Sequence, residues 1–149
     1  MKRLRRLAIG LSMLCFAGSL VSHVAVLQDA DGTQVMSDMR GWYLLAFGWL
    51  APLGGWLAVE WWANPLLVCS WVSLWRGDAK CALWWACFAL ALGMIFSLRS
   101  EFMTSTKPDW AQISGYQVGY WFWLASMAFA GCGSLACVRT ESVLKEVTD

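Results

Sequence analysis

The chain has 149 residues, a length typical of one domain covering residues 1–149, but 59% of them are hydrophobic and the mean hydropathy is +0.53. A soluble domain of this size is about half apolar, so the composition excludes an ordinary soluble fold and favours a membrane protein. The net charge is only +1 and no basic face exists beyond residue 6, so we expect no nucleic-acid partner.

Charged residues divide the chain into apolar runs that are long enough to cross a bilayer, whose core needs about 20 helical residues. We expect spans at about 7–27, 57–75, 81–98 and 116–138, with a further helical piece at 41–56 before the second span. The predicted fold class is an all-α membrane protein. It is a four-span transmembrane helix bundle with a broken or re-entrant segment before the second span.

Residues 1–6, MKRLRR, carry four positive charges and precede the first apolar run. The segment is either a cleaved signal peptide or an uncleaved span. The span-length run, with no small-residue cleavage site before Gln28, favours the span. Positive charge here predicts a cytoplasmic amino terminus. We interpret His23 as an interfacial polar residue rather than a proton relay or metal ligand, and residues 28–40 as a solvated outer loop.

Residues 41–75 hold seven of the twelve tryptophans and one formal charge. Gly-Trp pairs recur every seven residues, which in a helix places the tryptophans along one stripe with a glycine beside each. Pro52 and the glycines at 54–55 predict a kink or break. Asn64 and Pro65 predict a helix start, because asparagine is a favoured cap and proline suits the first helical position.

The number of spans depends on whether residues 41–75 cross the membrane once or twice. One crossing gives four spans, with eight Lys and Arg residues in the inner segments and three in the outer segments. Two crossings give five spans and a split of six to five. The positive-inside rule favours four spans. In that model the inner residues are Lys2, Arg3, Arg5, Arg6, Arg76, Lys80, Arg139 and Lys145, and the outer ones are Arg40, Arg99 and Lys107.

Four residues are candidates for a functional role. Glu60 is the one acid inside the tryptophan-rich run, and an intramembrane acid is a functional hypothesis by default, although an interfacial position among tryptophans is the alternative. Asn64 follows it. Tyr116 and Tyr120 repeat a Gly-Tyr pair one helical turn apart, which fits either a ligand cleft or anchoring at the membrane surface.

Small residues are spaced for close helix contact in the later spans. Ala82 and Ala86 lie four residues apart, as do Ala89 and Gly93, and this spacing predicts a ridge along which another helix packs. Residues 99–114 are predicted to be a second outer loop, and the tail at 139–149 a cytoplasmic segment. The six cysteines lie in or next to apolar runs, so we interpret them as small buried residues rather than disulfide partners.

Two stretches together carry a resemblance. They are Trp62-Ala63-Asn64-Pro65-Leu66-Leu67, and Ile113-Ser114-Gly115-Tyr116 followed by Gly119-Tyr120-Trp121-Phe122-Trp123-Leu124-Ala125-Ser126. Over roughly residues 41–128 the chain resembles an uncharacterised group of small multi-pass bacterial inner-membrane proteins with W-x-A-N-P-L-L and G-Y-x-x-G-Y-W-x-W-L-A-S segments. The resemblance implies a bacterial inner membrane and assigns no functional residues.

Three function classes are compared. Enzyme motifs are missing: there is one histidine, no H-E-x-x-H, no G-x-S-x-G and no Cys-x-x-Cys, so we expect no catalysis, cofactor or metal. A proton-coupled transporter or channel subunit using Glu60 is the alternative. The favoured class is a non-enzymatic interaction, accessory or immunity-type protein, whose partners are the lipid bilayer and either another membrane protein or a second copy of the chain.

Overall fold

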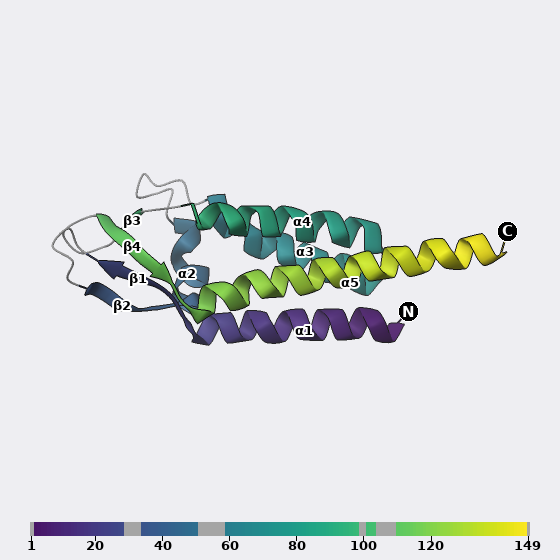
Figure 1. The fold of residues 1–149 in the computed structure, drawn as a ribbon, viewed down its shortest axis with the longest axis horizontal. Helices are drawn as coiled ribbons and strands as arrows, with labels where there is room; N and C mark the ends of the chain where they lie inside the picture. Colours follow the sequence, from purple (N-terminus) through teal and green to yellow (C-terminus); the bar gives the residue numbers. More distant parts are fainter. Residues whose placement is uncertain (1, 29–33, 51–58, 99–100, 104–109, 149) are drawn as a thin grey trace.

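The structure, a computed structural model, describes residues 2–28, 34–50, 59–98, 101–103 and 110–148. It is mostly helical, which confirms the predicted helical class. Four helices run side by side as a bundle (Figure 1): α1 (Lys2–Val21), α3 (Ala63–Arg76), α4 (Ala79–Phe96) and α5 (Val118–Thr148). Among the described residues, three helices are long and apolar enough to cross a membrane, namely α1, α4 and α5.

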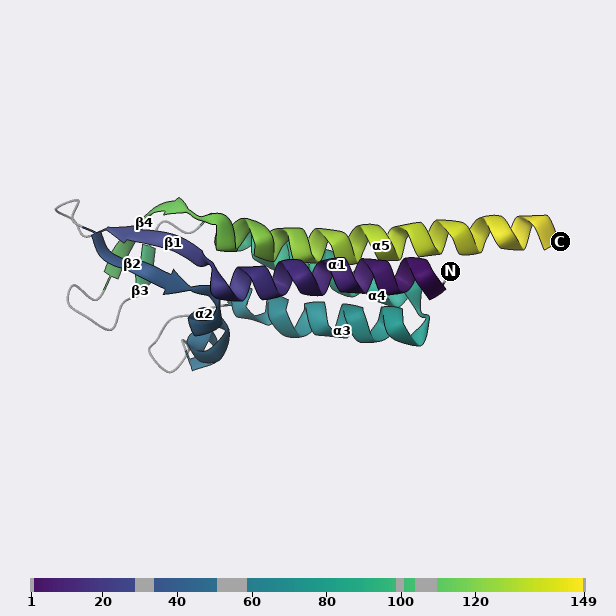
Figure 2. The same ribbon diagram turned by 90° about the horizontal axis from the view of Figure 1, so that it is seen from below.

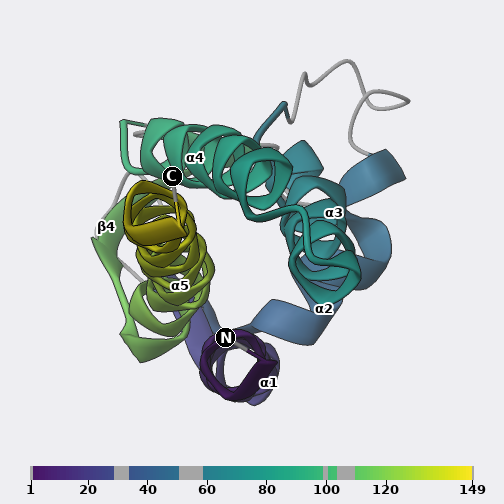
Figure 3. The same cartoon turned by 90° about the vertical axis from the view of Figure 1, so that its right-hand side faces the viewer.

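The order of the helices around the bundle follows from one tight turn and two long contacts. α5 packs along α1 on one side and along α4 on the other, and α3 packs along α4 (Figures 2 and 3). The turn between α3 and α4 is closed by Gly77, which has a φ of 98°, and by Asp78, whose side chain accepts a hydrogen bond from the backbone N–H of Cys81 at 3.0 Å. Glycine is favoured at such a left-handed position, and aspartate is a favoured helix cap.

Small side chains form the contact surfaces inside the bundle. The ridge predicted on α4 is buried, with Ala82, Ala86, Ala89 and Gly93 all facing other helices. Ridges of alanine and glycine let helix backbones approach closely, which is the usual packing mode between spans. Large apolar side chains, such as those of Leu14 on α1 and Trp84 on α4, point outward instead.

A four-stranded sheet extends from the end of the bundle opposite both chain termini (Figure 1). Its strands are β1 (His23–Gln28), β2 (Gln34–Arg40), β3 (Glu101–Met103) and β4 (Trp110–Tyr116), in the order β2-β1-β4-β3. All three strand pairs are antiparallel. The interpretation of 28–40 and 99–114 as loops, and of 23–27 as the end of a span, is therefore wrong where these strands lie.

The two central strands continue the two helices that pack most closely. β1 follows α1 directly and β4 precedes α5, and they pair with Ala25 opposite Tyr116. Leu27 in β1 is fully buried, and Leu44 and Ile113 pack against it. The pairing of β1 with β4 therefore extends the contact between α1 and α5 beyond the bundle.

The predicted helical piece at 41–56 is partly described. Helix α2 covers Gly41–Phe47, and residues 48–50 continue it as a 3-10 turn. A second 3-10 helix, η2 (Val59–Trp62), leads directly into α3. The break predicted at Pro52 and the glycines at 54–55 lies outside the described residues, as does the third Gly-Trp pair.

Candidate functional site

The four candidate residues all lie at the end of the bundle that carries the sheet (Figure 1). Glu60 is in η2, and Asn64 is the second residue of α3. Tyr116 is the last residue of β4, and Tyr120 is in the first turn of α5. η2 contacts α4, so these elements meet where α4 ends and α5 begins.

Tyr116 and Tyr120 belong to one cluster of aromatic rings. Their ring centroids are 4.5 Å apart, and the ring of Phe96 lies within 6 Å of both. Trp123 completes the cluster, with its centroid 6.3 Å from that of Tyr120. Tyr120 is only 1% exposed, so its ring fills the interior rather than marking the membrane surface.

The two tyrosine hydroxyls complete the hydrogen bonds at the end of α4. Tyr116 donates to the carbonyl of Phe96 at 2.7 Å, and Tyr120 donates to that of Gly93 at 3.3 Å. The last four carbonyls of a helix lack partners within the helix, and these two belong to that set. The tyrosines therefore fasten the end of α4 to the beginning of α5.

Asn64 joins α3 to α5 instead of capping α3. Its Oδ1 accepts a hydrogen bond from Trp123 Nε1 at 2.9 Å, and its Nδ2 donates to the carbonyl of Trp61 at 3.1 Å. Helix α3 begins at Ala63, and the residue before it makes no side-chain cap. The predicted cap is wrong because η2 already continues the helical path into α3. Through Trp123, Asn64 is connected to the tyrosine cluster.

A second polar network in the bundle interior connects three helices, and the motif analysis did not find it. Trp71 Nε1 on α3 donates to Ser12 Oγ on α1 at 2.8 Å, and that hydroxyl donates to the carbonyl of Ser126 on α5 at 2.6 Å. Phe16 lies edge-on to Trp71, with 5.6 Å between their centroids. Only a general rule could have pointed to it, since a buried polar side chain needs a hydrogen-bond partner.

Among the residues that the structure describes, Glu60 is the one buried acidic side chain. Its residue is only 4% exposed, and it sits in the four-residue η2 helix against α4. Burying an ionised carboxylate is costly unless a hydrogen-bond donor or a cation is paired with it. Because η2 leads directly into α3, Glu60 lies at the same end of the bundle as Asn64 and the two tyrosines.

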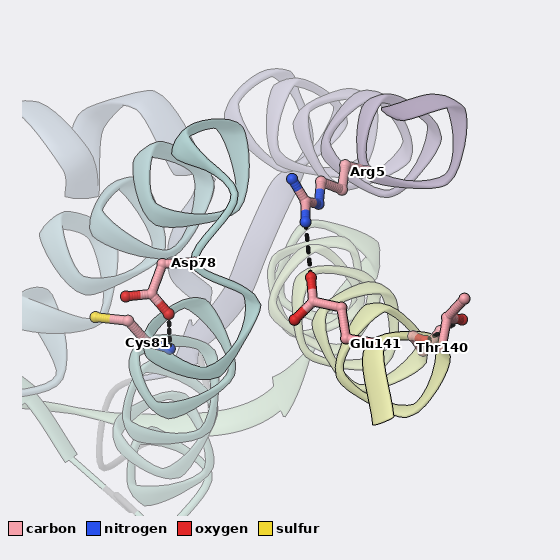
Figure 4. A network of polar contacts seen from close by, with 6 residues as sticks. Arg5, Asp78, Cys81, Thr140 and Glu141 are labelled. Atoms are coloured by element: carbon pink, nitrogen blue, oxygen red, sulfur yellow. Dashed lines mark hydrogen bonds and ion pairs between the residues drawn. The ribbon is translucent and has the colours of Figure 1, made fainter. Parts of the chain in front are cut away.

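The opposite end of the bundle has its own polar cluster, centred on Arg5 (Figure 4). Arg5 Nη2 lies 2.7 Å from Glu141 Oε1, an ion pair that ties the start of α1 to the far part of α5. Its Nη1 would lie 2.8 Å from a Cβ built on Gly77. The guanidinium therefore sits at the C-terminus of α3, where a cation is favoured by the helix dipole.

Within the part of the chain that the structure describes, no three His, Cys, Asp or Glu side chains are grouped as a metal site. His23 begins β1, where it is half-buried and opposite Arg40 in the strand register. The six cysteines are free thiols, and three of them, Cys69, Cys87 and Cys132, are exposed on helices.

No protein-family model, no curated protein and no solved structure matches this chain.

Proposed function

We propose that the chain is an integral membrane protein with four spans. Three are α1, α4 and α5, and the additional one, second in chain order, is formed by η2 and α3 together. These two elements form an uninterrupted helical path over Val59–Arg76. At 2.0 Å per residue for the 3-10 turn and 1.5 Å for the α-helix, the path is about 29 Å long, close to the thickness of a bilayer core. α3 also lies beside the three helices of spanning length, which supports a shared environment.

The proposed location is the bacterial inner membrane, with both termini in the cytoplasm. Both termini lie at the same end of the bundle (Figure 1), as an even number of spans requires. The segments that reach this end, at 2–6, 76–80 and 139–149, hold eight basic and four acidic residues. The two segments that connect the proposed spans on the opposite side, 22–58 and 97–117, hold three basic and five acidic residues. This asymmetry supports the orientation, and the resemblance supports the bacterial membrane.

The proposed activity is binding to another membrane protein or to a second copy of the chain, rather than catalysis. The observation that carries it is that side chains of the chain itself pack inside the bundle, whereas the sheet has two edge strands. The described interior is filled by alanine ridges and by the hydrogen bonds that join Trp71, Ser12 and Ser126. The sheet ends in β2 on one side and β3 on the other. Edge strands present unpaired backbone groups that recognise a partner strand.

Site-specific photocrosslinking in cells tests this proposal. A photoreactive side chain at Arg40, exposed on the edge strand β2, should form an adduct with one discrete protein, or with a second copy. The same group at Leu14, exposed on α1 and expected to face lipid, serves as the matched control and should form none. If neither Arg40 nor Gln112, exposed on the central strand β4, yields a protein adduct, the interaction function is wrong.

A second candidate function, a small proton-coupled transporter or channel subunit, is favoured by the burial of Glu60 next to α4. Flux driven by a proton gradient in proteoliposomes, lost in Glu60→Gln, would support it. Glu146→Gln, at an exposed position near the end of α5, is the control and should leave any flux unchanged. Absence of flux in the unmodified protein, or equal flux in Glu60→Gln, would contradict this candidate.

A further inference from the structure

Helix α2 lies across the sheet-side end of the bundle, between the end of α1 and the beginning of α3 (Figure 3). At its first residue, Gly41 donates its N–H to the carbonyl of Ser22 at 3.2 Å and packs against the carbonyl of Ser19. Past its last residue, Gly48 packs against the ring of Trp61, whose Nε1 donates to the carbonyl of Leu45 at 3.1 Å. The two glycines of the Gly-Trp repeat are therefore points of close approach to the bundle.

The tryptophans of the same repeat point away from the bundle. Trp42 is 52% exposed and Trp49 is 56% exposed, and no residue of α2 is buried. Tyr43 and Phe47 add to this surface, with 4.9 Å between their ring centroids. Residues 41–50 carry no formal charge. The result is a short helix with an aromatic outer face, which we call the α2 face, made of Trp42, Tyr43, Phe47 and Trp49.

The position of the α2 face along the axis of the bundle follows from the elements to which α2 is attached. It is fixed to the last turn of α1 and to η2, so it lies level with the ends of the spanning helices. Trp62 and Trp121, at the same end, are also about 60% exposed. Exposed tryptophans in a band at the end of spanning helices are typical of the zone where lipid headgroups meet acyl chains.

We infer that α2 is an interfacial helix whose α2 face lies in the headgroup–acyl boundary of the leaflet on the sheet side. This inference rests on the proposed membrane insertion. Its partner is the lipid surface because the face is uncharged and aromatic and is attached at the end of the spanning helices. A helix of this kind is buried about 5–10 Å into the boundary and does not enter the bilayer core. The Gly-Trp repeat then has a physical meaning, with glycine toward protein and tryptophan toward lipid.

Fluorine NMR of the full chain in lipid nanodiscs tests the depth. The protein is labelled with 5-fluorotryptophan, and its resonances are assigned with Trp42→Phe, Trp49→Phe, Trp71→Phe and Trp84→Phe. A lipid with a nitroxide at acyl carbon 5 should broaden the Trp42 and Trp49 signals at least about twofold more than one with a nitroxide at carbon 16, because the boundary is shallow. A soluble gadolinium chelate should broaden them less than the shallow lipid label. Trp71, in the bundle interior, should respond least.

Each other outcome has a definite meaning. Stronger broadening by the deep label would show that α2 enters the bilayer core, and stronger broadening by the chelate would place it in water. Protection of the Trp42 and Trp49 signals from all three probes would show that protein covers the α2 face, either a second copy of the chain or another partner. Each of these results overturns the interfacial assignment. If Trp84, exposed on α4, is broadened by neither lipid label, the membrane insertion itself is wrong, and the inference fails with it.

Discussion

At the scale of single residues, Gly77 and Arg5 show how one end of the bundle is held together. Gly77 ends α3 with a positive φ, and its N–H donates to the carbonyls of Ser73 and Leu74. The missing side chain also leaves the space in which the guanidinium of Arg5 lies before it reaches Glu141. One glycine thus serves both the turn and the contact between three helices.

Replacement of Gly77 by alanine should lower the free energy of unfolding by at least about 1–2 kcal/mol, the cost of a left-handed backbone for a residue with a Cβ. The new Cβ would also lie 2.8 Å from Arg5 Nη1, so the end of this flexible side chain would have to move. Unfolding of the purified protein in mixed micelles measures the loss. Gly10→Ala is the matched control, because a Cβ there meets nothing within 4 Å in the middle of α1. Equal stability of the two variants would contradict the role of Gly77.

The candidate residues show which parts of a site a single sequence reveals. The types and rough positions of Glu60, Asn64, Tyr116 and Tyr120 follow from composition and spacing. Their partners do not, because Trp123 is 59 residues from Asn64 and Tyr116 is 20 residues from its acceptor. Hydrogen bonds of this kind depend on how the helices are rotated against one another, and hydropathy does not specify that rotation.

At the scale of elements, the sheet is the part of the fold that the sequence did not predict. The helices follow from apolar runs that are uniform enough to be recognised locally. The central pair, β1 and β4, joins segments almost 90 residues apart, as the 3.2 Å hydrogen bond from Ser114 Oγ to the carbonyl of Val26 illustrates. In addition, residues 23–27 are as apolar as the span before them. No local period distinguishes a strand from the end of a helix there.

Leu27→Ala should destabilise the sheet, because the buried side chain touches both Leu44 and Ile113. Truncation of a buried leucine typically costs about 2–5 kcal/mol. Hydrogen exchange of the backbone amides should therefore accelerate in β1 and β4 while that of α4 stays unchanged. Val26→Ala, at a half-buried position of the same strand, is the control and should have a smaller effect. Unchanged exchange in β4 would show that Leu27 does not hold the strands together.

At the scale of the whole molecule, topology depends on whether α3 crosses the membrane. Four spans place the turn at Gly77 and the carboxyl terminus on the side of the amino terminus. Without a crossing by α3, that turn and the carboxyl terminus would both lie on the opposite side. The uneven distribution of basic residues favours four spans, since positive segments are retained in the cytoplasm.

Reporter fusions to the full chain and to its truncations should distinguish these arrangements. Alkaline phosphatase fused after Gly77 or at the carboxyl terminus should be inactive, and green fluorescent protein at the carboxyl terminus should fluoresce. Phosphatase fused after Gln28, the last residue of β1, should be active in both arrangements, which makes it the internal positive control. Active phosphatase at both Gly77 and the carboxyl terminus would show that residues 41–76 do not cross exactly once, and would overturn the four-span model.

The length of α5 has a practical consequence for a chain of only 16.6 kDa. At 31 residues it is about 46 Å long, and it continues past the ends of the other helices (Figure 1). A second protein could be fused after Thr148 so that its first helix continues α5 as one unbroken helix. The two proteins would then be held rigidly, with no flexible linker between them. Such a chimera would give electron microscopy a rigid fiducial mass outside the detergent belt, while the sheet at the other end stays unobstructed.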